Sequence, residues 1–386
     1  MSQRIFTHRP LLGDDELSAV ARVMESGWLG MGPKARAFED ALRTHLEVPH
    51  VVAVSSGTAA LHLALEALDL PPGSGVIVPS LTFVATVQAI RAARLVPVFC
   101  EVDSSTLQID LADAARILDA PGAAGGHTTA IRAVLPVHFG GSTCDMPSLL
   151  RLAEAHGLAV VEDAAHAFGS TAEGRPVGTL GTIGCFSFDP VKNITCGEGG
   201  AVATRSARLA DRVRQARVLG IAADGWARHS GAAGWRYDVR GRGWRYHLPD
   251  LNAAIGLAQL EKIDGFRARR QALVRQYATQ LAGAPLMTPV TVPNPDVCPF
   301  TYTIRVHGGR RDPLMASLRA LGIGTTVEYV PNHLHDAFAP FRRPMPVTER
   351  VFEEILSLPL HAGLRDEDVT AVASAVRAFL ENEAAA

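Results

Sequence analysis

The feature that most constrains the fold is the alternation of short apolar runs with helical patterns over about the first 260 residues. Candidate strands lie at about 50–54, 76–80, 96–102, 130–141, 158–170, 182–188 and 199–204. Several of these runs are apolar throughout, which is typical of strands that are covered on both faces in a parallel sheet. Because helical patterns separate them, as at about 83–93, the sequence predicts an α/β fold with a mostly parallel central sheet covered by helices.

The pattern changes near residue 262. A long helical stretch, a strand and two further helices are expected at 251–281, 302–307, 313–322 and 366–386. We therefore predict a large α/β domain with an N-terminal arm over 1–262 and a smaller C-terminal α+β domain over 263–386. The stretch 222–250 is rich in Gly, Arg and Trp, and a loop of that length in a compact domain is usually functional or lies at an interface.

Composition narrows the choice of partner and compartment. The chain has 37 basic and 39 acidic residues, a net charge of −2, which gives no electrostatic reason to expect nucleic acid or an anionic membrane. The five cysteines are widely spaced without a CxxC pair, so we expect buried free thiols rather than disulfides or a zinc site. No secretory signal and no membrane-spanning apolar stretch are visible, and we expect a cytoplasmic protein.

Four motifs follow candidate strands, and ligand sites of parallel sheets lie outside the carboxyl ends of the strands. The first motif is Ser55-Ser56-Gly57-Thr58, between a strand and a helix. Backbone N–H groups at a helix start and small hydroxyl side chains suit a phosphate. An ordinary serine or threonine N-cap is the alternative.

The second motif is an apolar strand that ends in Glu162 and Asp163, with His166 three residues further on. A carboxylate at a strand end can pair with a protonated ring nitrogen, and His166 can line the same pocket. A metal pair or a structural aspartate with satisfied hydrogen bonds are the alternatives, and no third ligand at metal-like spacing supports the metal.

The third and fourth motifs contain a lysine and an aromatic residue. Lys192 lies between apolar sequence and a Gly-rich turn, and a lysine held in a pocket can have a lowered pKa and form a Schiff base. Ser187, five residues earlier, can reach the same phosphate as the first motif. Phe83, in Pro79-Ser80-Leu81-Thr82-Phe83, is either a core residue or a ring that stacks on a flat cofactor.

Together, the four motifs provide a phosphate site, a platform for a flat ring, an acid for a pyridine nitrogen and a lysine for an aldehyde. These are the groups that pyridoxal phosphate needs. No metal is expected.

The sequence also resembles the DegT/StrS-type sugar aminotransferase family of fold-type I pyridoxal-phosphate enzymes, almost end to end. The segments that carry the resemblance are SGWLGMGPKARAFEDAL, SSGTAALHLAL, PSLTFVAT, VVEDAAHAFGS, FSFDPVKNITCGEGGAV, RYHLPDLNAAIGLAQLEKID and PVTERVFEEILSLPLHAGLRDEDV. The ordered set is much more specific than any one segment.

The resemblance implies a role for each matched residue. Lys192 would bind the cofactor aldehyde and then move the proton in transamination, and Asp163 would pair with the pyridinium nitrogen. His166 would lie beside the ring near its phenolic oxygen, and Phe83 would stack on the ring face. The phosphate would be held by Gly57, Thr58 and Ser187. The resemblance also implies a homodimer whose active sites are completed across the interface by the segment GWRYHLPDLNAAIG.

Three positions depart from the family pattern. Arg245 replaces an asparagine that reaches the neighbouring subunit's phosphate in many relatives, and an arginine can also bind phosphate. Asp189 replaces a histidine or similar residue before a proline. Glu328 replaces a histidine that lies near the sugar pocket in many relatives. The last two changes concern the substrate rather than the chemistry.

The hypothesis from the sequence is an aminotransferase that uses L-glutamate or L-glutamine and a nucleotide-linked 3- or 4-keto-6-deoxyhexose. Arginines at 228, 236, 240, 242 and 245 either meet the nucleotide diphosphate or form a solvated face. One alternative is a cyclitol ketone aminotransferase, which uses the same catalytic groups. A 3-dehydratase is disfavoured because those relatives have histidine in place of the lysine. An inactive regulator or scaffold is the alternative of another class.

Overall fold

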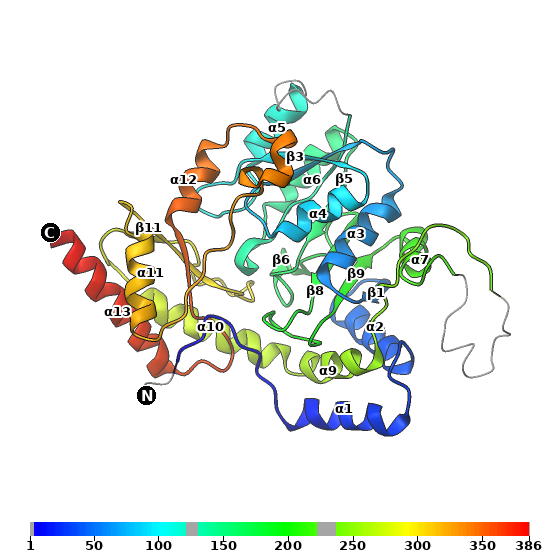
Figure 1. The fold of residues 1–386 in the computed structure, drawn as a ribbon, viewed down its shortest axis with the longest axis horizontal. Helices are drawn as coiled ribbons and strands as arrows, with labels where there is room; N and C mark the ends of the chain where they lie inside the picture. The colour runs from blue at the N-terminus through cyan, green and yellow to red at the C-terminus, as the bar shows by residue number, and fades with distance from the viewer. Residues whose placement is uncertain (1–3, 121–129, 222–236, 386) are drawn as a thin grey trace.

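The computed structural model describes residues 4–120, 130–221 and 237–385. It contains a seven-stranded central sheet with helices on both faces and a smaller three-stranded sheet in the C-terminal part (Figure 1). This architecture confirms the predicted α/β fold with a C-terminal α+β part.

The central sheet has the strand order β1-β9-β8-β5-β4-β2-β3. Its strands are β1 (His50–Val54), β2 (Gly75–Pro79), β3 (Val96–Cys100), β4 (Ile131–Val134), β5 (Ala159–Asp163), β8 (Ile183–Ser187) and β9 (Gly200–Thr204). Only β9 runs antiparallel to its neighbours β1 and β8, and the other pairs are parallel. All seven predicted strands are therefore present, and the sheet is mostly parallel as expected.

Alternation along each strand divides the core between two faces. In β2, Val76 and Val78 pack with the helices on one face, whereas Ile77 packs with those on the other. The first face is covered by α3 (Gly57–Leu68), α4 (Val84–Ala92) and α7 (Ala207–Ala216), and the second by α5 (Leu111–Asp119) and α6 (Met146–Ala155). Burial on both faces explains why several strands, such as β2 and β3, are apolar throughout.

Three helices pack together at one end of the sheet: α1 (Asp14–Ser26), α2 (Pro33–His45) and α9 (Asp250–Leu260). The start of α2 has a Gly-Pro sequence without a capping side chain of its own. Asp250 supplies the cap, because its Oδ1 accepts hydrogen bonds from the N–H groups of Gly32 at 2.8 Å and Ala35 at 2.9 Å. The short elements η2 (Phe139–Gly141), β6 (Thr171–Ala172) and β7 (Arg175–Pro176) lie in connections.

The C-terminal part is built around the antiparallel sheet β10-β11-β12. Its elements are α10 (Ile263–Gln280), β10 (Met287–Pro289), β11 (Tyr302–Val306), α11 (Arg311–Ala320), η3 (Asn332–Leu334), η4 (Asp336–Phe341), α12 (Pro346–Glu354), β12 (Ile355–Leu358) and α13 (Asp366–Ala385). The N-terminal segment lies against this part, where Ile5 bridges to Ile323 (Figure 1). The division of the chain into domains at residue 262 stays a prediction.

Two expectations from composition can be compared with the structure. All five cysteines are buried and none is in a disulfide. Within residues 4–120, 130–221 and 237–385, no helix has both the length and the apolar character needed to cross a membrane.

Candidate active site

A cavity of about 630 Å³ lies beyond the carboxyl ends of β2, β5 and β8. Parallel strands end at the same edge of a sheet, which brings the loops that follow them together. Seven of the eight predicted site residues line this cavity: Gly57, Thr58, Phe83, Asp163, His166, Ser187 and Lys192. The predicted convergence of the four motifs on one crevice is therefore observed.

The first turn of α3 lies on the cavity beside β8. Ser56 caps this helix, because its Oγ accepts a hydrogen bond from the Ala59 N–H at 3.1 Å, while Gly57 and Thr58 face the cavity. A Cβ atom at Gly57 would lie 2.8 Å from the Cβ of Ser187, so only glycine allows this close approach. The cap and the anion site are therefore compatible readings of one motif, and helix N–H groups and two hydroxyls meet here.

Asp163 is the last residue of β5, and its buried carboxylate faces the cavity. Its Oδ2 accepts a hydrogen bond from the Thr86 hydroxyl at 2.8 Å, and its Oδ1 accepts one from the Ala165 N–H at 3.1 Å. Burial raises the pKa of Asp163, although these hydrogen bonds and the charge of Lys192 act in the opposite direction. A cation placed against this carboxylate would favour its ionised form.

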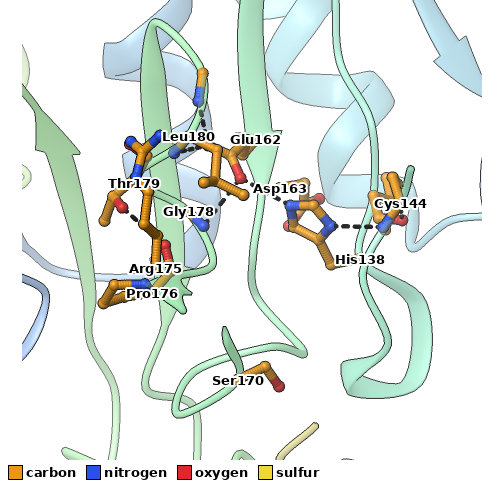
Figure 2. Close-up of polar contacts among 12 residues, drawn as sticks. His138, Cys144, Glu162, Asp163, Ser170, Arg175, Pro176, Gly178, Thr179 and Leu180 are labelled. Carbon is orange, nitrogen blue, oxygen red and sulfur yellow. Dashed lines mark hydrogen bonds and ion pairs between the residues drawn. The ribbon is translucent and has the colours of Figure 1, made fainter. Parts of the chain in front are cut away.

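Glu162 points to the opposite side of β5 and belongs to a separate buried network (Figure 2). Its carboxylate accepts hydrogen bonds from the N–H groups of Gly178, Leu180 and Gly181 at 2.9, 2.7 and 2.6 Å. His138 Nε2 lies 3.0 Å from it. Because His138 Nδ1 accepts from the Cys144 N–H at 3.3 Å, Nε2 is the nitrogen that carries the proton.

The Glu162 network does not support a metal pair made of Glu162 and Asp163. Two adjacent strand residues point to opposite faces, so Glu162 and Asp163 do not face one ion. In the part of the chain that the structure describes, no group of three His, Cys, Asp or Glu side chains is arranged to hold a metal. Glu162 instead fixes the turn before β8.

Lys192 reaches the cavity from the turn after β8. Its Nζ lies 4.5 Å from the centre of the Phe300 ring. Burial lowers the pKa of Lys192 below its ordinary value, while the carboxylates of Glu328, Asp189 and Asp163 act in the opposite direction. A lysine in this environment loses its proton more easily than a surface lysine and is a better nucleophile.

His166 lies in a group of rings beside Lys192. It stacks on Phe300, with ring centres 4.3 Å apart. Its Nδ1 accepts from the Gly140 N–H at 3.4 Å, so Nε2 carries the proton and donates to the Tyr329 hydroxyl at 2.9 Å. Burial lowers the pKa of His166 well below its usual range and raises that of Tyr329 well above its own. Both rings are therefore uncharged near neutral pH.

Phe83 is not a core residue. It precedes α4, lines the cavity and is 54% exposed, so the core alternative for this position is wrong. Its ring centre lies 5.4 Å from that of Tyr329. The exposed ring face is available to a flat ligand.

Arg245 does not line the cavity of its own chain. It is exposed and lies in a bridge with Val218. Arg242 pairs with Glu66 at 2.9 Å, also outside the cavity lining. The predicted nucleotide contacts Arg228 and Arg236 fall outside the described residues.

Sequence reasoning missed several lining residues that contact the predicted site residues or their neighbours, among them His8, Thr86, Phe300 and Tyr329. Thr86 follows Thr82 by one helical turn within the quoted segment PSLTFVAT, and this spacing is a usable signal. Tyr329 is adjacent to Glu328, which had been singled out. No local signal identifies His8 or Phe300, because their contacts with each other and with His166 join distant parts of the chain.

The lining fits pyridoxal phosphate on the evidence of its own residues. No side chain fits at Gly57 against Ser187, so the backbone at the α3 start stays open to the cavity, and the buried Asp163 carboxylate faces the same cavity, where a protonated ring nitrogen could pair with it. Phe83 offers a ring face, and Lys192 offers an amine with a lowered pKa. These groups lie around one cavity.

Comparison with known proteins gives the same result. The profile of the DegT/DnrJ/EryC1/StrS aminotransferase family matches residues 10–377. The structure of the aminotransferase TlmJ from Streptoalloteichus hindustanus is similar with a TM-score of 0.90 and 34% identity, covering 99% of this chain and 100% of that one. The structure of the sugar aminotransferase CalS13 from Micromonospora echinospora is similar with a TM-score of 0.86 and 32% identity, covering 97% of this chain and 99% of that one.

The cofactor is supported in the same way. Spr1654 from Streptococcus pneumoniae, known in a PLP form and a PMP form, is similar with a TM-score of 0.88 and 26% identity, and the PLP form covers 98% of this chain and 99% of its own. The chain is therefore a pyridoxal-phosphate-dependent aminotransferase that belongs to the DegT/DnrJ/EryC1/StrS aminotransferase family.

Proposed function

We propose that this enzyme transfers an amino group from L-glutamate, or from L-glutamine, to a nucleotide-linked 3- or 4-keto-6-deoxyhexose in amino-sugar biosynthesis. The observation that carries the proposal is one cavity of about 630 Å³ lined by Lys192, Asp163 and the α3 start, because this volume accommodates a cofactor together with a sugar ring. The 32% identity with the sugar aminotransferase CalS13 supports the same substrate class.

Each predicted site residue on the cavity lining has a proposed role. Gly57, Thr58 and Ser187 hold the phosphate through N–H groups and hydroxyls, and Phe83 covers one face of the ring. Asp163 would accept a hydrogen bond from the protonated pyridine nitrogen through its carboxylate. Pyridoxal phosphate, when bound, supplies an aldehyde that carries the amino group and a ring that withdraws electrons.

Lys192 and His166 have the remaining roles. Lys192 would hold the cofactor aldehyde through Nζ, and its neutral amine would move a proton at the substrate carbon. Its lowered pKa favours this neutral form. His166, with Nε2–H directed at Tyr329 and Nδ1 occupied by Gly140, keeps an uncharged ring beside the cofactor.

We also propose that the active enzyme is a cytoplasmic homodimer with shared active sites. Arg245 is exposed and lies outside the cavity of its own chain, which fits a contact with the phosphate in the partner subunit's site. Arginine binds phosphate through two parallel hydrogen bonds, so it can replace an asparagine in this contact.

Product analysis tests the substrate. The purified enzyme is incubated with pyridoxal phosphate, L-glutamate and either a nucleoside-diphosphate-linked 4-keto-6-deoxyhexose or scyllo-inosose, and aminated product is measured by mass spectrometry. We expect amination of the nucleotide sugar, and none with Lys192→Ala. Amination of the inosose alone would favour the cyclitol alternative. Loss of donor turnover with every ketone would favour an inactive regulator or scaffold.

A further inference from the structure

Glu328 forms a hydrogen-bonded group on the cavity lining that none of the roles above uses. Its side chain is 6% exposed. Its Oε1 lies 3.0 Å from His8 Nε2, and its Oε2 accepts from the Ser357 hydroxyl at 3.2 Å. Because a carboxylate only accepts hydrogen bonds, His8 Nε2 carries the proton in this pair.

The N-terminal arm fixes the position of His8. Ile5 exchanges backbone hydrogen bonds with Gly322 at 3.1 Å and Gly324 at 2.8 Å, and the Thr7 carbonyl accepts from the Leu360 N–H at 3.0 Å. The His8 ring stacks on Phe300, with ring centres 5.0 Å apart and planes 2° apart. Glu328 is therefore held in place by parts of the chain more than 300 residues apart.

The chemistry of this carboxylate selects its ligand. Each of its oxygens accepts up to two hydrogen bonds, and the residues that the structure describes supply one to each. The Glu328 carboxylate can therefore accept further hydrogen bonds. The cavity lining also carries more acidic than basic groups: the carboxylates are Asp163, Asp189, Glu198 and Glu328, and the cations are Arg4 and Lys192. Carboxylates of the amino donor and phosphates of a nucleotide are repelled from Glu328, whereas ring hydroxyls can donate to it.

We propose that Glu328, positioned by His8, accepts a hydrogen bond from a ring hydroxyl of the ketone substrate and so determines specificity for the acceptor. The inference rests on the proposed function, because it concerns the second half-reaction only. It assigns the donor's carboxylates and the nucleotide to other parts of the cavity.

The test uses Glu328→Gln in the full-length enzyme loaded with cofactor. Glutamine has the same shape, can still accept from His8 and can donate to Ser357, so the fold is expected to persist. The two half-reactions are measured separately, with L-glutamate and with the nucleoside-diphosphate-linked 4-keto-6-deoxyhexose. The dissociation constant of the same sugar reduced to the alcohol, which cannot react, is measured by calorimetry on the cofactor-free protein.

The matched control is Glu349→Gln. Glu349 also pairs with a histidine, since its Oε1 lies 3.1 Å from His333 Nε2, but it does not line the cavity. For Glu328→Gln we expect kcat/KM with the sugar to fall about tenfold to a hundredfold, which is the range for one hydrogen bond to a charged group. The reduced sugar should bind more weakly by a similar factor, with most of the donor rate retained. Glu349→Gln should leave all three quantities unchanged.

Two outcomes overturn the inference alone. If the half-reactions with the sugar and with L-glutamate slow equally, Glu328 acts on catalytic residues that both half-reactions use. If neither half-reaction changes, Glu328 does not bind a hydroxyl of the sugar. If the wild-type enzyme aminates no keto-sugar while it still reacts with L-glutamate, the proposed function fails, and the inference fails with it.

Discussion

The Thr86 hydroxyl donates a hydrogen bond of 2.8 Å to the Oδ2 of Asp163. Thr86 Oγ1 also lies 2.9 Å from the Thr82 hydroxyl, one turn earlier, at the start of α4. Since the single proton of Thr86 goes to the carboxylate, Thr82 is the donor in the second bond. Two buried threonines thus support the ionised form of Asp163 against the effect of burial.

Thr86→Val should remove this support. We expect a higher pKa for Asp163 and turnover lowered about tenfold, because one hydrogen bond to a charged group is lost. The acid limb of the activity profile should move to higher pH, since Asp163 becomes protonated sooner. Steady-state kinetics across pH measure both effects. Thr86→Ser keeps the hydroxyl and should have the turnover and the pH profile of the wild type. Equal pH profiles for the valine and serine variants would contradict a hydrogen bond from Thr86 that supports Asp163.

Gly57→Ala should weaken cofactor binding. A Cβ atom at this position would lie 2.8 Å from Ser187 Cβ, so α3 must move away from β8 and the phosphate site widens. Fluorescence titration with pyridoxal phosphate measures the dissociation constant, which we expect to rise at least about tenfold. The control is Gly265→Ala in α10, where a Cβ atom meets nothing within 4 Å. It should bind cofactor normally and gain about 0.5–1 kcal/mol in stability.

His361 should make the stability depend on pH. Burial lowers the pKa of His361 to about 4, and Arg270 acts in the same direction. An unfolded chain has a histidine pKa of about 6.5, so between these values the unfolded state binds the proton and the folded state does not. The stabilisation is therefore complete above about pH 6.5 and is lost as the pH falls toward 4.

Urea unfolding at pH 7 and pH 5 measures this effect. We expect His361 to account for about 2 kcal/mol of the loss in unfolding free energy between these conditions. His361→Gln should reduce the loss by that amount, whereas His156→Gln, at an exposed position, should not. The same pH dependence in His361→Gln and the wild type would show that His361 does not titrate as described.

The fold could be predicted from the sequence because the local alternation of apolar strands and helices determines it. Strands such as β2 and β3 are apolar throughout, and helices separate them, so both the parallel sheet and its layers follow from periodicity. The reversed direction of β9 was not predicted, since strand direction depends on the length and path of the connection rather than on the residues of the strand.

Only part of the candidate site could be predicted from the sequence. Asp163 and Lys192 could be found because Asp163 ends β5 and Lys192 follows β8, at the edge of the sheet where ligands bind. His8 and Phe300 could not, because their placement depends on packing between the N-terminal arm and the C-terminal part. The alternatives for Phe83 could not be separated by sequence either, since an aromatic residue at a strand–helix junction looks the same whether it is buried or exposed.

The most direct test of the account is the visible absorption spectrum of the purified protein with pyridoxal phosphate, before and after L-glutamate is added. The account predicts a visible band from cofactor bound covalently to Lys192, which decays with L-glutamate. Lys192→Ala should lack the band while circular dichroism shows an intact fold, and Lys34→Ala, outside the cavity lining, should keep it. A folded wild-type protein without the band, or a folded Lys192→Ala variant that retains it, would contradict the account.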